Sequence, residues 1–233
     1  MLSIVIPALN EEKYLPKLLK SIKEQTYKNY EIIVADARSS DSTRQIAKKF
    51  GCVLVKSGGL PGVGRNNGAK AAKGDMLLFL DADSLIEKDF LERSINDMQA
   101  RGLDAAGSHL YPSTGKLLDR SFMFIFNSWA YMAQLCYPNA CGTGIFCKKW
   151  LHEKIKGFDE SIKLSEDMDY VRRCGKFGKF RLIKGTRVIY SMRRFSKEGR
   201  AKLGLKLFLS FVYRLVFGEI RSDIFKYKMD YKK

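Results

Sequence analysis

Short apolar runs alternate with amphipathic segments over the first eighty residues. The runs are rich in β-branched residues and predict buried strands at 2–7, 30–36, 52–56 and 76–81. Between them, a helix is predicted over 11–24, a capped helix ending at Gly51, and then a glycine-rich loop with a short helix. This alternation predicts βαβ units and a mainly parallel sheet flanked by helices, an α/β fold.

The pattern becomes less regular after residue 100. It predicts a strand over 103–111, an aromatic-rich helix over 117–137 and a strand followed by a helix over 142–155. A helix with an acidic first turn follows over 164–179, and a strand entering a basic turn over 187–195. No repeat or low-complexity linker interrupts this stretch. We therefore expect one domain over residues 1–195 and a separate C-terminal segment over 196–233.

Charge is concentrated near the C-terminus. The 233 residues carry a formal net charge of +17, and residues 148–233 account for +14 of it. This asymmetry indicates an anionic partner, such as a phosphorylated substrate, an acidic membrane surface or a nucleic acid. The five cysteines are odd in number and form no C-x-x-C pair, which favours reduced thiols, and we read no signal peptide in the first residues.

Polar residues follow three of the four predicted strands, at the edge of the sheet where ligands bind in α/β proteins. Asn10 and Glu11 follow the first strand, Asp36 ends the second, and Asp81 and Asp83 follow the fourth. Two neighbouring carboxylates repel one another unless a cation lies between them, and Mg²⁺ and Mn²⁺ prefer such ligands. The alternative is that Asp83 or Ser84 caps a helix that starts near Glu87.

Five motifs in order resemble those of family 2 glycosyltransferases, which are inverting enzymes with the GT-A fold that use nucleotide-diphospho-sugars. They are PALNEE (7–12), ADARSSDST (35–43), GRNNGAKAAKGDMLLFLDAD (64–83), GFDE (157–160) and SEDMDYVRRCGKFG (165–178). The resemblance covers about residues 2–195, and the block ending in Asp81-Ala82-Asp83 is its most specific part.

The resemblance implies roles for individual residues in donor binding. Residues implied to contact the nucleotide or its diphosphate are Pro7, Asn10, Glu11, Asp36, Arg65 and Asp81, and YSMRRF (190–195) implies Arg193 and Arg194 as clamps for a diphosphate or a phosphate-bearing acceptor. Asp81 and Asp83 match the D-x-D motif, which implies Mn²⁺ or Mg²⁺ as cofactor. The chain reads Asp36-Ala37-Arg38-Ser39 where the family often has Asp-Asp-Gly-Ser, which leaves the donor base, UDP or GDP, open.

The resemblance also implies a catalytic base. Glu166-Asp167 match an E-D motif, and Asp167 is implied to take a proton from the acceptor hydroxyl. The alternative is an acidic helix N-terminus that pairs with Arg172 and Arg173.

Beyond residue 196 the resemblance ends and an amphipathic pattern begins. Lys202, Lys206, Ser210 and Arg214 form one polar stripe on an otherwise apolar helix over 201–220. We expect this helix to lie in an anionic membrane interface with its cations toward the headgroups, at the cytoplasmic face of the membrane. The alternative is a helix docked on its own domain or on a second copy.

The predicted function is sugar transfer to a lipid-linked or membrane-proximal acceptor. A nucleotidyltransferase is a second enzymatic reading, but the basic, glycine-rich loop expected after its first strand is replaced by acidic NEE. A basic nucleic-acid-binding protein is a third, but five acidic residues would then lie at the strand ends.

Overall fold

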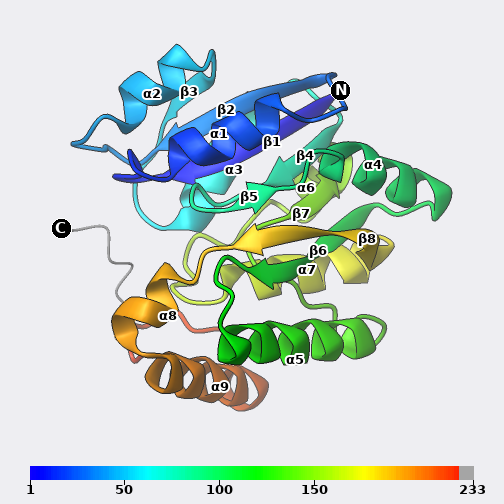
Figure 1. The fold of residues 1–233 in the computed structure, drawn as a ribbon. Helices are drawn as coiled ribbons and strands as arrows, with labels where there is room; N and C mark the ends of the chain where they lie inside the picture. Colours follow the sequence, from blue (N-terminus) through cyan, green and yellow to red (C-terminus); the bar gives the residue numbers. More distant parts are fainter. Residues whose placement is uncertain (226–233) are drawn as a thin grey trace.

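A mixed eight-stranded sheet forms the centre of the molecule in the computed structural model, which describes residues 1–225 (Figure 1). The strands are β1 (Leu2–Ala8), β2 (Tyr30–Asp36), β3 (Val53–Lys56), β4 (Met76–Phe79), β5 (Leu85–Ile86), β6 (Ala105–Pro112), β7 (Ile145–Lys148) and β8 (Phe180–Tyr190). Their order is β3-β2-β1-β4-β7-β6-β8-β5. The first four strands are parallel, as the alternation predicted, whereas β7 runs antiparallel to both β4 and β6.

Helices cover the sheet and confirm the α/β fold class. They are α1 (Leu15–Lys23), α2 (Thr43–Lys49), α3 (Pro61–Ala71), α4 (Phe90–Ala100), α5 (Leu117–Ala133), α6 (Lys149–Lys154), α7 (Glu166–Phe177), α8 (Arg193–Glu198) and α9 (Arg200–Phe217). Four aliphatic residues on one face of α1 are all buried, namely Leu15, Leu18, Leu19 and Ile22. The basic turn predicted after the last strand is instead the short helix α8.

Both faces of the sheet are buried, so successive residues of β1 belong to different cores. Ile4 and Ile6 join one apolar cluster with α1, and Val5 joins the other with α3. Because a strand points alternate side chains to opposite faces, a continuous apolar run is what a doubly covered strand requires.

The glycine-rich segment forms part of α3 rather than the loop that the sequence suggested. A Cβ atom on Gly68 would lie 2.3 Å from Cγ1 of Val5, and one on Gly64 would lie 3.0 Å from Cβ of Pro7. These glycines therefore let α3 approach β1 closely, and this brings the first turn of α3 to the carboxyl end of the sheet.

The C-terminal helix α9 packs on the domain with the last two residues of its polar stripe inward, so the predicted outward orientation is wrong for Ser210 and Arg214, whereas Lys202 is exposed. Ser210 and Arg214 are buried, and Lys206 approaches Glu198 at 3.5 Å. Arg214 donates a hydrogen bond from Nε to Glu219 at 2.8 Å, because a buried guanidinium needs a carboxylate partner. The apolar side of α9 faces outward beside α5 (Figure 1), and the last basic residues of the tail, 226–233, lie outside the described residues.

Candidate functional site

A cavity of about 590 Å³ opens at the carboxyl ends of β1 and β4. Its walls include the loops after these two strands, the first turns of α3 and α7, the junction of β8 with α8, and the sides of α5 and α9. Eight of the residues singled out by the sequence line it: Pro7, Glu11, Arg65, Asp81, Asp83, Asp167, Arg193 and Arg194.

Arg65 joins two of the acidic motifs at the bottom of the cavity. Its guanidinium donates hydrogen bonds to Asp81 at 2.8 Å and to Glu166 at 2.7 Å, and it lies 5.3 Å from the ring centroid of Phe158. Burial opposes the charge of this side chain, but Asp81, Glu166 and Asp167 outweigh that effect and raise its pKa. Arg65 therefore remains a cation although it is only 3% exposed.

Arg193 makes a second bridge at the opposite wall. It donates two hydrogen bonds to Glu11, at 2.9 and 2.5 Å, and its Nε lies 2.9 Å from Oδ2 of Asp83. The guanidinium also lies 4.7 Å from the ring centroid of Tyr14. The groups opposite Asp81 and Asp83 are thus two arginines, one from α3 and one from α8.

The two aspartates nevertheless fit a divalent cation. Both line the cavity, with side chains 32% and 18% exposed. Burial raises the pKa of Asp83, Arg193 lowers it and Asp81 raises it. No group of three His, Cys, Asp or Glu able to hold a metal occurs in residues 1–225. A cation here would use one or two carboxylates and complete its coordination with substrate phosphates, as Mg²⁺ commonly does.

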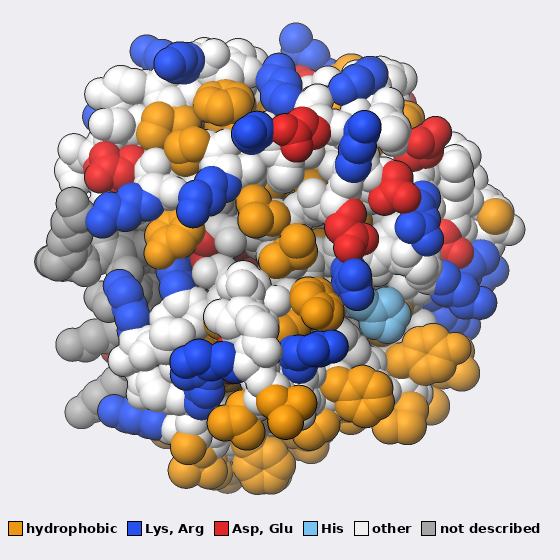
Figure 2. All heavy atoms as spheres, in the orientation of Figure 1, with side chains coloured by type: hydrophobic (Ala, Val, Ile, Leu, Met, Phe, Trp, Pro, Cys, Tyr) orange, Lys and Arg blue, Asp and Glu red, His pale blue; other side chains and the backbone are white. Residues whose placement is uncertain are grey.

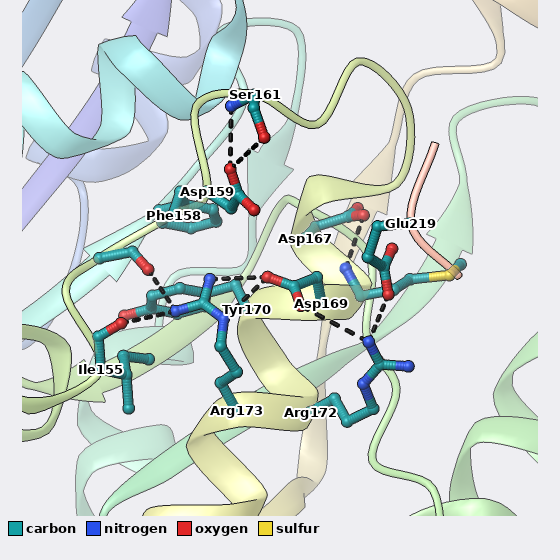
Figure 3. Close-up of polar contacts among 12 residues, drawn as sticks. Ile155, Phe158, Asp159, Ser161, Asp167, Asp169, Tyr170, Arg172, Arg173 and Glu219 are labelled. Atoms are coloured by element: carbon teal, nitrogen blue, oxygen red, sulfur yellow. Dashed lines mark hydrogen bonds and ion pairs between the residues drawn. The ribbon is translucent and has the colours of Figure 1, made fainter. Parts of the chain in front are cut away.

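Asp167 lies in the first turn of α7, and its carboxylate accepts a hydrogen bond from the backbone N–H of Met168 at 2.8 Å (Figure 3). Burial and the neighbouring Glu166 raise its pKa to about 7, while Arg65 acts in the opposite direction. A carboxyl group with this pKa can exchange a proton near neutral pH.

Arg172 and Arg173 of α7 pair with Asp169, and not with Glu166 or Asp167 as the alternative considered. Arg173 contacts Asp169 at 2.7 Å and Arg172 contacts it at 3.5 Å, and both lie away from the cavity-lining carboxylate of Asp167 (Figure 3). Asp167 therefore forms no structural ion pair with Arg172 or Arg173.

Asn10 and Asp36 hold the loops beside the cavity rather than forming its wall. The side chain of Asn10 accepts a hydrogen bond from the N–H of Ser40 at 2.9 Å. Asp36 accepts one from the N–H of Ser39 at 3.2 Å, and Nε of Arg44 lies 3.8 Å from it. The structure thus gives these two residues a supporting position.

Two further contributions were not assigned from the sequence. Glu166 orients Arg65 by accepting its hydrogen bond. The only indication of this role in the sequence was the position of Glu166 next to Asp167. Glu219 binds both Arg172 and Arg214, and Arg214 in turn contacts the sulfur of Met168 at 3.0 Å. Glu219 is one of four acids in the basic segment 196–233, and nothing in the sequence indicated that it would pack against the helix that carries Asp167.

Comparison with known proteins identifies the family. A sequence model described as "Glycosyl transferase family 2" matches residues 3–155. The chain belongs to this family. It is 30% identical to Glycosyltransferase AglE of Haloferax volcanii over 189 residues, which cover 76% of this chain and 62% of AglE. It is 29% identical over 249 aligned residues to the amylovoran biosynthesis glycosyltransferase AmsB of Erwinia amylovora, covering 97% of this chain and 81% of AmsB.

Solved structures share the fold. The structure of S. aureus TarS 1–349 in complex with UDP superposes with a TM-score of 0.68 at 22% identity, covering 82% of this chain and 60% of TarS 1–349. The mannosyltransferase PcManGT from Pyrobaculum calidifontis, in complex with GDP-Man and Mn²⁺, gives 0.69 at 17% identity, covering 90% and 60%. The chain thus spans under two thirds of the length of AglE and of both solved proteins.

Proposed function

We propose that this family 2 member transfers a sugar, with inversion, from a nucleotide-diphospho-sugar to a lipid-linked or membrane-proximal acceptor. The observation that carries the proposal is the meeting of Asp81, Asp83 and Asp167 in one cavity with Arg65 and Arg193. Family membership favours this function over nucleotidyl transfer and over nucleic-acid binding.

The donor would bind with its diphosphate at Asp81 and Asp83. These carboxylates would hold Mn²⁺ or Mg²⁺, which supplies Lewis-acid stabilisation of the leaving diphosphate. Arg193 and Arg194 lie on the cavity wall and offer guanidinium groups to phosphate oxygens. Pro7 and Ala8 line the same cavity at the end of β1, where backbone groups can read a base. The related structures contain UDP in one case and GDP-Man in another, and both bases stay candidates for this chain.

In the transfer step the acceptor oxygen attacks the anomeric carbon while the bond from that carbon to the diphosphate oxygen breaks. With a hydroxyl acceptor, the O–H proton passes to the carboxylate of Asp167, whose pKa of about 7 suits a general base. A phosphate acceptor is already an anion and needs no base, and arginine then becomes the more important contact.

A membrane surface is the proposed location of the acceptor, and the segment 196–233 the proposed means of reaching it. The described helices include none that is long and apolar enough to cross a bilayer. The outward sides of α5 and α9 form one apolar face (the α5–α9 face), visible at the lower edge of Figure 2. Its most exposed members are Leu117, Leu118, Phe124, Met132, Leu135, Val216 and Phe217. A face of this kind, on a protein of net charge +17, suits peripheral binding to the anionic cytoplasmic leaflet.

A thermal-shift panel of UDP- and GDP-sugars with and without Mn²⁺ tests the donor site. We expect stabilisation by one donor that requires both the nucleotide and the metal, and about 3 kcal/mol at a hundredfold excess over Kd. Asp83→Ala should abolish it, whereas Asp75→Ala, which removes an exposed aspartate near the N-terminus, should not. If no donor stabilises the protein with either Mn²⁺ or Mg²⁺, the proposed function is wrong.

A further inference from the structure

The cavity that holds the acidic cluster has a second, apolar half. Its far walls come from α5 and α9, and the side chains that form them include Phe122, Phe126, Trp129, Leu207 and Phe211. In the proposed donor pose the flat face of the base lies at Pro7 and Ala8 and the diphosphate lies at Asp81 and Asp83, so these aromatic walls are left for another ligand. The apolar half therefore has room and chemistry that the donor does not use.

This apolar half is continuous with the outer surface. Ile125 of α5 and Phe208 of α9 both line the cavity, yet they are 66% and 61% exposed. They belong at the same time to the cavity and to the α5–α9 face. The mouth of the apolar half therefore opens on the face proposed to meet the membrane.

Few contacts close the space between the two helices. The rings of Trp129 and Phe211 lie 5.1 Å apart, and Arg200 at the start of α9 donates hydrogen bonds to Asp119 at 2.6 and 2.9 Å. These contacts fix α9 beside α5, and between them the side chains face a cavity instead of a close-packed core.

We infer that the apolar half, between α5 and α9, binds the hydrocarbon chain of the acceptor. This inference rests on the proposed function and names its acceptor class, an amphiphile with one long hydrocarbon chain. The chain enters from the bilayer through the mouth at Ile125 and Phe208, and the polar head reaches Asp167 and Arg194 in the other half. The two halves together have a volume of about 590 Å³, within the range of small-molecule sites.

Gly204 offers a way to fill the apolar half without disturbing the fold. It lies on α9 and lines the cavity, and no described atom lies within 4 Å of a Cβ built on it. Gly204→Leu therefore places a side chain in the space that a lipid chain would occupy. Ala201→Leu adds a similar side chain to the same helix at an exposed position outside the cavity wall, and it is the matched control.

Trp129 provides a local reporter. The chain has two tryptophans, and the other, Trp150, lies on α6 away from the cavity wall, so Trp150→Phe leaves Trp129 as the single emitter. The probe is 11-bromoundecyl phosphate below its critical micelle concentration, because bromine quenches indole on contact. We expect saturable quenching, unchanged in Ala201→Leu and weakened about tenfold or more in Gly204→Leu.

Equal quenching in the two leucine variants would place the probe on the outer face and overturn the inference, as would a lack of saturable quenching. Sedimentation of the unliganded protein adds a further outcome. A dimer that Gly204→Leu converts to a monomer would make the apolar half an interface between copies. Donor stabilisation measured on the Trp150→Phe protein, which keeps Gly204, separates the two proposals, since saturable quenching without donor stabilisation refutes sugar transfer and leaves the hydrocarbon site standing.

Discussion

The environment of Asp167 explains how one carboxyl group of an acidic pair is suited to the proposed role of base. Glu166 accepts a hydrogen bond from Arg65 at 2.7 Å. Asp167 faces the cavity and accepts a hydrogen bond from the backbone N–H of Met168. These two neighbours in the sequence thus differ in environment, because the helix turn points Glu166 toward Arg65 and Asp167 toward the cavity. This separation of roles predicts a distinct titration for Asp167.

Asp167→Asn should remove the base and change the pH dependence. With a hydroxyl acceptor we expect the rate of the wild-type protein to rise with pH through about 7 and the variant to lose roughly 10²- to 10⁴-fold in kcat. Measuring kcat from pH 5 to 9 checks both expectations. Substantial residual turnover with a flat profile would instead indicate a phosphate acceptor, which needs no base.

The same substitution, Asp167→Asn, should raise the stability of the protein although it lowers the activity. The pKa of Asp167 is raised in the folded state, so its contribution to stability is present below pH 4 and is lost as pH rises through about 7. Asp167→Asn, which cannot ionise, should therefore be more stable than wild type at pH 8, by roughly 1–3 kcal/mol. Urea unfolding at pH 8 and pH 4 measures the difference, which should disappear at pH 4. A constant difference at both values would show that ionisation is not its cause.

Close packing decides the conformation of the glycine-rich segment at the scale of elements. The sequence resembles a loop, but α3 becomes helical because Gly64 and Gly68 allow its backbone to contact β1. Helix propensity alone disfavours these glycines, so tertiary contact overrides it. The helix in turn carries Arg65 to the acidic cluster.

Two glycine substitutions of the same type should have opposite effects. Gly68→Ala places a methyl group against Val5 and should destabilise the protein by about 1–3 kcal/mol. Gly204→Ala, in an open position of α9, should be neutral or stabilising by up to about 1 kcal/mol. Chemical denaturation of both variants makes the comparison, and similar effects would contradict the packing argument.

The whole molecule combines an acidic cavity at the sheet edge, the proposed donor site, with an apolar face made by α5 and α9. The buried end of the polar stripe of α9 makes contacts inside the protein, where Arg214 forms an ion pair with Glu219. The apolar side of the helix therefore faces outward. The result is an apolar surface that the described part of the chain leaves exposed. A membrane is the environment that we propose for it.

Replacing three residues of this face should weaken vesicle binding. Leu209, Leu215 and Val216 are all exposed, and their joint change to serine should lower partitioning to phosphatidylglycerol vesicles by about tenfold or more. Co-sedimentation measures binding, and circular dichroism verifies that the helix is retained. Val53→Ser with Phe177→Ser, two exposed apolar residues elsewhere, should leave partitioning unchanged. Equal loss in the control would show that general surface hydrophobicity is responsible.

Local pattern determined most of the strand and helix order, because hydrophobic period and strand-end polarity can be read along the chain, but it missed β5 and α8. It also located Asp81 and Asp83 at a strand end, and the family resemblance added Asp167. Only the tertiary structure decided which cations face these acids, because Arg65 and Arg193 reach them over separations of 16 and 110 residues. It also reversed the expected orientation of α9: a periodic pattern defines the two sides of a helix, but a buried partner such as Glu219 decides which side turns inward.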